Sequence, residues 1–308
     1  MAMPFYTMLR NKYSNSKITF LSPEVLGDFP DEGLRDDKIL MSTDERKISK
    51  AFVKKALELK QEKYDLAISL PSSFSSAFFL CLSGATQRVG FAAGGSELFF
   101  HASIQWKGNT SLQHKSALYA SLFEFLTAQK LDDFDGFKKN SGTKENYIVI
   151  APGASLPLRE YPYFSELLLE LSQSYPDYKL VLIGSKNEEK YNSQVKRLKL
   201  PNVENRIGRT SLPVVIDLCR NSSLVISNDS GVAHLSASIA GAMTLVLMGP
   251  GDPDYILPLG GNAFAVREEG LPCSPCEKAY CRAAYGYQAC LKRLLPEKVI
   301  ERMKTLTP

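Results

Sequence analysis

The stretch that decides the fold is LVISNDSGVAHLSASIAGAMTLVLMGPGDP, residues 224–253. It opens as a short apolar run, breaks at Asn228-Asp229-Ser230-Gly231, and continues through small residues and His234 into a second apolar run. Short apolar runs bounded by turn residues are typical of buried strands, and the segment between them has the length of a helix. The stretch therefore predicts a strand, a helix and a second, parallel strand.

The same alternation of strand and helix extends along most of the chain. Strands are predicted at 17–22, 38–41, 65–70 and 88–91, then at 147–152, 179–184, 224–227, 244–249 and 263–266. The apolar spacing predicts helices at 45–61, 114–129, 164–174, 188–198, 212–220 and 232–240. This pattern predicts an α/β protein with two Rossmann-like domains, each built on a parallel sheet, facing a cleft. The predicted domains span residues 1–140 and 141–292, and a C-terminal helix occupies residues 293–308.

Composition narrows the class of protein. The chain has 308 residues, 44% of them hydrophobic, and a formal net charge of +4. The length suits about two domains, and so mild a charge does not predict nucleic acid as a partner. No apolar run approaches the ~18 residues that span a membrane, and residues 1–13 lack the pattern of a signal peptide. We therefore expect a cytoplasmic protein whose six cysteines are thiols.

Polar residues stand where strands are predicted to end, which is where open parallel sheets bind ligands. Ser155 follows the strand at 147–152, and Asn228 to Gly231 open the helix that carries His234. A helix N-terminus offers unpaired N–H groups to a phosphate. Two simpler interpretations stay open: Asp229 as an ordinary helix N-cap, and His234 as a hydrogen-bonded core residue. No GxxxxGK[ST] motif is present, and no GxGxxG follows the first strands.

At this point the sequence resembles a known family. The 226–253 segment is similar to the Asp-Ser/Thr-Gly-x-x-His and Gly-Pro-Thr-Asp-Pro signature of glycosyltransferase family 9, the heptosyltransferases of lipopolysaccharide core assembly. APGASLPLREYP (151–162), IGRTSL (207–212), GATQRVGF (84–91) and the cysteine-bearing tail (273–299) resemble other segments of that family, in the same order. The similarity covers nearly the whole chain.

The resemblance implies a function. It implies a GT-B fold and an inverting, metal-independent transfer of a heptose-type sugar from a nucleotide sugar such as an ADP-sugar. No cofactor would be required. The acceptor would be an anionic glycolipid of the lipopolysaccharide core, reached by peripheral contact with the cytoplasmic face of the inner membrane. We expect a monomer whose C-terminal helix packs back on the N-terminal domain.

The resemblance also implies site residues. Arg159, where the family has a lysine, and His234 would support catalysis, and Glu204 would contact the ribose. Ser73, Arg88 and His114 are the expected acceptor-side residues. The full set expected to bind the donor is Ser155, Arg159, Glu204, Asn228, Asp229, Ser230, Gly231 and His234.

Two departures from the family pattern affect this interpretation. Family members begin with a strand and Gly-Asp, whereas this chain opens at the residues that follow them, so the N-terminal domain is expected to lack its first strand and the aspartate that acts as general base. Either the native chain is longer, or the protein is a non-catalytic nucleotide-sugar-binding pseudoenzyme. A nucleotide-sugar epimerase is a third alternative, disfavoured by Gly-Pro-x-Asp-Pro and the cysteine tail. Gly251 also replaces the family's threonine.

Four cysteines cluster near the C-terminus. Cys273, Cys276, Cys281 and Cys290 have the spacing C-x2-C-x4-C-x8-C. Four thiolates with a leading C-x2-C suit a tetrahedral structural zinc, although the second half lacks the usual C-x2-C. The alternative is a thiol-rich loop without metal. No catalytic metal is expected.

Overall fold

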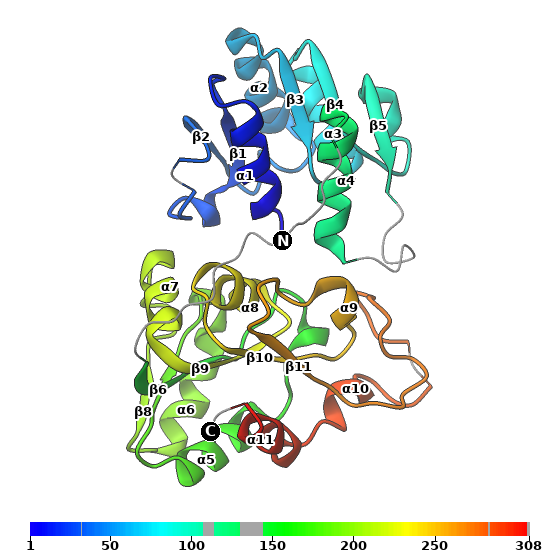
Figure 1. Cartoon of the computed structure of the whole chain (residues 1–308). Helices are drawn as coiled ribbons and strands as arrows, with labels where there is room; N and C mark the ends of the chain where they lie inside the picture. The colour runs from blue at the N-terminus through cyan, green and yellow to red at the C-terminus, as the bar shows by residue number, and fades with distance from the viewer. Residues whose placement is uncertain (32, 107–113, 130–143, 283, 307–308) are drawn as a thin grey trace. The chain divides into compact units, whose positions relative to one another are not determined.

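The computed structural model describes residues 1–31, 33–106, 114–129, 144–282 and 284–306. The chain divides into two compact units, residues 2–134 and residues 135–308, the second also including Met1 (Figure 1). The division lies close to the predicted boundary between residues 140 and 141.

The C-terminal unit is built on one parallel sheet with the order β11-β10-β9-β6-β7-β8. Its strands are β6 (Glu145–Ala151), β7 (Lys179–Leu182), β8 (Val203–Asn205), β9 (Ser222–Asn228), β10 (Thr244–Leu247) and β11 (Ala263–Val266). The strand order reverses between β6 and β9, which pair in parallel. In sheets of this kind the crevice at the carboxyl ends of the two reversing strands is the usual ligand site.

Helices cover both faces of this sheet. Successive residues of a strand point to opposite faces, so Ile148 and Ile150 pack in one core with α5 (Phe164–Ser174) while Val149 packs in another with α7 (Leu212–Asn221). Burial on both faces explains why the strands read as continuous apolar runs in the sequence. Helix α6 (Asn192–Leu198) adds Val195 to the first core.

The C-terminal helix α11 (Pro296–Lys304) packs within the C-terminal unit. Its buried residues Val299, Ile300 and Met303 belong to the core of the C-terminal unit, where α11 contacts α5. The expected packing of residues 293–308 on the N-terminal domain stays a prediction. The apolar residues of α11 lie three or four apart, so they share one face of the helix, and this face is buried in the core beside α5.

The helix predicted at 232–240 has two parts. It begins as α8 (Gly231–His234) and continues as a π-helical turn over residues 235–239. Ser236 Oγ donates to the Ala233 carbonyl at 3.0 Å, and Thr244 Oγ1 lies 2.9 Å from Ser236 Oγ, tying the turn to the first residue of β10. The small buried residues of this segment let it lie close against the sheet.

The N-terminal unit has two parallel sheets, β1-β2 and β3-β4-β5. The strands are β1 (Thr19–Pro23), β2 (Asp37–Met41), β3 (Leu66–Ser69), β4 (Gln87–Ala92) and β5 (Ala102–Gln105). The helices are α1 (Met3–Lys12), α2 (Lys50–Leu59), α3 (Phe74–Leu82) and α4 (Lys115–Thr127), with short 3₁₀ turns at 24–26, 60–62 and 96–99. Helices α1 and α3 and strand β5 were not predicted.

The two N-terminal sheets are not joined by any strand among the described residues. Residues of β1 are all at least partly accessible, whereas six of the seven residues of β9 are buried. Thr19 Oγ1 is buried without a hydrogen-bond partner in the described part of the chain. The expectation that this unit lacks its first strand stays a prediction.

Candidate functional site

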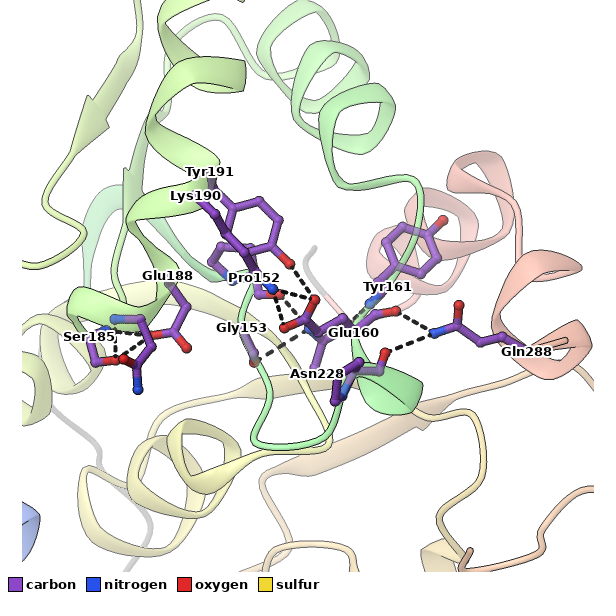
Figure 2. Close-up of polar contacts among 12 residues, drawn as sticks. Pro152, Gly153, Glu160, Tyr161, Ser185, Glu188, Lys190, Tyr191, Asn228 and Gln288 are labelled. Atoms are coloured by element: carbon purple, nitrogen blue, oxygen red, sulfur yellow. Dashed lines mark hydrogen bonds and ion pairs between the residues drawn. The ribbon is translucent and has the colours of Figure 1, made fainter. Parts of the chain in front are cut away.

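The loop after β6 and the end of β9 are joined by the side chain of Asn228. Its Nδ2 donates to the carbonyls of Pro152 at 2.7 Å and Gly153 at 3.4 Å, and its Oδ1 accepts from the Tyr161 N–H at 3.2 Å (Figure 2). Asn228 is buried. It was predicted to bind a donor, and the structure gives it a positioning role, because its amide is already engaged by the protein backbone.

An arginine and two carboxylates lie beside this junction. Arg159, which ends the 3₁₀ turn η5 (Pro157–Arg159), places Nη1 2.9 Å from Asp229 Oδ2. Its Nη2 lies 3.8 Å from Glu277 Oε2. The Arg159 side chain is 23% exposed, and its Nε is buried with no hydrogen-bond partner among the described residues. A partly accessible cation with an unused donor is suited to meeting an anionic ligand.

Glu277 was not singled out by the sequence analysis. It belongs to the cysteine-bearing segment, and its Oε1 accepts from the Asp252 N–H at 2.5 Å. Burial raises the pKa of the Glu277 carboxyl, while the Asp252 N–H and Arg159 act in the opposite direction. The segment therefore brings a second carboxylate to Arg159.

Gly251 makes room for Asp229. A Cβ at position 251 would lie 2.6 Å from Asp229 Oδ2 and 2.9 Å from Ile256 Cδ1, both well inside van der Waals contact. A side chain at position 251 would therefore displace the Asp229 carboxylate from its present position. The sequence analysis noted the replacement of the family's threonine without this steric reason.

The remaining residues predicted at the carboxyl ends of β6 and β9 are found there. Ser155 is exposed in the loop after β6, and His234 is half-buried at the end of α8. Ser230 is the N-cap of α8, so the simpler interpretation of Asp229 as the cap is wrong. Ser230 Oγ lies 3.1 Å from Ser227 Oγ. A Cβ at Gly231 would meet no protein atom within 4 Å, so this backbone faces open space.

Glu204 is not brought to this site. It lies on β8 at the edge of the sheet, with β7 between it and β6. Its carboxylate accepts from Arg206 Nε at 2.5 Å and is 2.7 Å from Lys179 Nζ, and these cations lower its pKa. The expected contact with a ribose has no support in this placement.

Two contacts that the sequence did not reveal hold η5 in place. Gln288 Nε2 donates to the carbonyls of Pro157, Leu158 and Glu160 at 3.3, 3.1 and 2.7 Å. Lys190 Nζ lies 2.7 Å from both carboxylate oxygens of Glu160 (Figure 2). No sequence signal marks Gln288, because its partners are about 130 residues away.

The three predicted acceptor-side residues have structural roles in the N-terminal unit. Ser73 caps α3 by accepting from the Ser76 N–H, and His114 Nδ1 accepts from the Ser116 N–H at the start of α4. Arg88 donates to the carbonyls of Phe99 and Ala85, both at 2.8 Å. These bonds account for all three side chains without a ligand.

The placement of the four cysteines bears on the predicted zinc site. In the described part of the chain, no group of three or more His, Cys, Asp or Glu side chains could hold a metal ion. Cys281 Sγ accepts from the Gln288 N–H at 3.4 Å, and Cys290 is buried in the core. The arrangement favours the thiol-rich loop; the zinc site stays a prediction.

Comparison with known proteins identifies the family. Residues 53–285 match the sequence profile of Glycosyltransferase family 9 (heptosyltransferase). The chain belongs to this family. Lipooligosaccharide heptosyltransferase 2 of Haemophilus ducreyi is 25% identical to it, over 99% of this chain and 95% of that protein. Membership confirms the resemblance and makes the chain a glycosyltransferase.

Solved structures of family members share the fold. The structure of E. coli ADP-heptose lps heptosyltransferase II has a TM-score of 0.75 and 21% identity, covering 98% of this chain and 93% of that one. E. coli heptosyltransferase WaaC with ADP has a TM-score of 0.72 and 20% identity, covering 99% and 94%. The predicted α/β class and GT-B fold are confirmed.

The contacts of Gln288 lead to a first prediction. Gln288→Ala leaves three carbonyls of η5 without their donor, so the free energy of unfolding should fall by about 1–3 kcal/mol. Hydrogen exchange at the Arg159 and Tyr161 amides should accelerate. Gln61→Ala, at an exposed position, serves as the control and should change neither quantity. Unchanged exchange at 159–161 in Gln288→Ala would contradict the anchoring role.

The raised pKa of Glu277 leads to a second prediction. Between its ordinary pKa of 4.5 and the raised value, the folded state binds more protons than the unfolded state, so this group lowers the free energy of unfolding as pH rises. Glu277→Gln should therefore gain stability relative to wild type between pH 4 and pH 7. Glu204→Gln is the matched control with the opposite sign, because the pKa of Glu204 is lowered and its stabilisation is present only above its unfolded pKa. Urea titrations across pH measure both, and parallel curves for Glu277→Gln and wild type would refute the assignment.

Proposed function

We propose that this protein transfers a heptose from ADP-heptose, or a closely similar nucleotide sugar, to the lipopolysaccharide core, with inversion at the anomeric carbon and without a metal ion. Family membership, the named activities of the relatives and the ADP in a structure of the same fold support the donor. The observation that carries the proposal is Arg159, partly exposed and 2.9 Å from Asp229, which lies two residues before the open backbone of Gly231 and just after β9, where the strand order reverses.

The proposed chemistry places specific demands on this site. An acceptor hydroxyl attacks the anomeric carbon from the face opposite the diphosphate, the bond from that carbon to the diphosphate oxygen breaks, and the hydroxyl proton passes to a base. Negative charge grows on the departing diphosphate, and fixed donors stabilise it best. Arg159 would supply two directed N–H groups, and the N–H groups at the start of α8 would supply others. Asp229 would hold the guanidinium until the donor enters.

The general base that would accept the proton of the acceptor hydroxyl decides between transfer and a second candidate function. The family's base is expected on an aspartate after its first strand, and no described strand joins the β1-β2 and β3-β4-β5 sheets. These observations favour, as the alternative, a pseudoenzyme that binds a nucleotide sugar without transferring it. General base catalysis typically contributes 10²–10⁴-fold, so such a protein would bind donor normally and form product very slowly or not at all.

Three further expectations belong to the proposal. A lipopolysaccharide acceptor implies work at the cytoplasmic face of the inner membrane through peripheral contact; no described helix is long and apolar enough to span a bilayer. A monomer and a cysteine-bound structural zinc are proposed on the sequence alone.

The donor assignment predicts ligand-dependent stability. ADP-heptose at a hundred times its Kd should raise the free energy of unfolding by ~2.7 kcal/mol. Asp229→Asn should reduce this gain because it releases Arg159, whereas Glu204→Gln, a matched removal of an acidic charge at the sheet edge, should retain it. Thermal shift with ADP-heptose and UDP-N-acetylglucosamine measures the effect and its selectivity. The absence of a shift with any nucleotide sugar would refute donor binding.

A substitution at Gly231 tests whether the donor approaches this backbone without disturbing the packing of the protein. Gly231→Ala should leave the stability of the unliganded protein within about 0.5 kcal/mol, because the new methyl group contacts no protein atom. Donor affinity should fall at least about tenfold, since the methyl group would occupy space needed by the diphosphate. Calorimetric titration of both proteins tests this. Equal affinities would show that the donor does not approach this backbone.

Turnover distinguishes the two candidate functions. With ADP-heptose and a heptose-deficient lipopolysaccharide acceptor, a transferase should release ADP and extend the acceptor by one heptose, as detected by mass spectrometry. Arg159→Ala should lower the rate by 10²-fold or more, in line with the loss of one charge-stabilising donor. Saturable donor binding without acceptor extension would favour the pseudoenzyme.

A further inference from the structure

Helix α2 carries apolar side chains on two faces. On its inner face, Phe52 and Ala56 are buried in a core with Phe79 of α3. On its outer face, Ile48, just ahead of the helix, is 57% exposed and Leu57 is 48% exposed. Ile48 and Leu57 are thus largely exposed to solvent, while Val53 between them is half-buried against this core.

The outer residues line a shallow hollow. It has a volume of about 750 Å³ and is lined by the apolar side chains of Ile48, Val53 and Leu57, by Lys50 and Lys54, and by Ser49, Glu58 and Gln61. Helix α2 contacts α3 within the N-terminal unit. An apolar strip edged by lysines is therefore presented to the solvent.

Positive charge is concentrated around this strip. Residues 46–63 contain seven lysines and arginines against two glutamates, while the whole chain carries only +4. Lys55 is within 4.0 Å of Glu45 and 3.8 Å of Glu58. Lys47, Lys50 and Lys54 are exposed, and within the described chain no acidic group lies at ion-pair distance from them. Three cations thus remain available to an external anion.

We propose that this face, made of Ile48, Val53 and Leu57 with Lys47, Lys50 and Lys54, binds the surface of a membrane containing anionic lipids. Apolar side chains would enter the headgroup boundary while the lysines pair with lipid phosphates, the arrangement that places an amphipathic helix in a membrane interface. A second copy of the chain fits less well, because a symmetric contact would bring two equally basic faces together. The proposal rests on the proposed function, whose acceptor is a membrane glycolipid, and it specifies how the enzyme reaches it.

Vesicle sedimentation of the full chain tests the electrostatic part. The protein should sediment with phosphatidylethanolamine–phosphatidylglycerol vesicles and not with phosphatidylcholine vesicles, and 0.5 M NaCl should weaken the binding. Lys50→Glu/Lys54→Glu should lower the partition coefficient at least about tenfold. Lys196→Glu/Lys199→Glu, two exposed lysines of the C-terminal unit, changes the net charge equally and should have little effect.

Two leucine variants test whether the apolar side chains of this face contribute to vesicle binding. Leu57→Gln should weaken vesicle binding several-fold, whereas Leu169→Gln, at a leucine of α5 that is 37% exposed, should not. Equal effects of the two lysine pairs, equal effects of the two leucine variants, or no binding to anionic vesicles would each overturn the proposal. So would concentration-dependent dimerisation that Lys50→Glu/Lys54→Glu abolishes, because a second copy would then be the occupant.

Donor binding separates this proposal from the proposed function. Lys50→Glu/Lys54→Glu should keep the thermal shift with ADP-heptose while losing vesicle binding, which also shows that the variant is folded. A wild-type protein that binds vesicles through α2 but shows no shift with nucleotide sugars would refute the donor assignment and leave the membrane surface standing. A shift with ADP-heptose without vesicle binding would refute the membrane surface alone.

Discussion

The amide side chain of Asn228 joins the end of β9, the loop after β6 and the chain entering α5. A buried amide that donates to two carbonyls and accepts from one N–H fixes the separation of these backbones, because any shift would leave buried polar groups unpaired. Arg159 lies two residues before the bonded N–H of Tyr161, and Asp229 follows Asn228 directly. The meeting of Arg159 and Asp229 at 2.9 Å is therefore set by one side chain that contacts neither of their charged groups.

Arg159, Asp229 and Gly251 fit together sterically, and the first two also attract each other by charge. A guanidinium is larger than an ammonium group and binds a carboxylate with directed N–H groups. The Asp229 carboxylate that meets it occupies the space that a Cβ at position 251 would need. Arg159 in place of the family's lysine and Gly251 in place of its threonine are thus compatible with one arrangement of Asp229. The cysteine-bearing segment completes it by placing Glu277 beside Arg159.

Much of the C-terminal unit could be predicted from sequence, because strands buried on both faces are continuous apolar runs and their carboxyl ends bear the polar residues. Helix α3 was missed because FSSAFFLCL is apolar around most of its circumference and so has no clear period. Glu204 was placed at the site by resemblance, although its strand lies at the sheet edge. Glu277, Gln288 and helix α11 contact residues that are distant in the sequence. Local sequence patterns cannot predict such contacts, because they form only in the folded chain.

The π-helical turn at 235–239 divides the segment between β9 and β10 into two parts, the start of α8 and the residues fastened to the sheet. Its extra residue is accommodated by the bond from the Ala240 N–H to the Leu235 carbonyl at 2.9 Å. Such a wide turn is a local departure from the regular ladder of α-helical hydrogen bonds. Ser236 is fastened to Thr244 and Ser238 to the Leu259 carbonyl, while Gly231 and His234 lie ahead of the turn. The fastening of the segment thus falls on the residues of the wide turn, and the space where a Cβ at Gly231 would lie stays open.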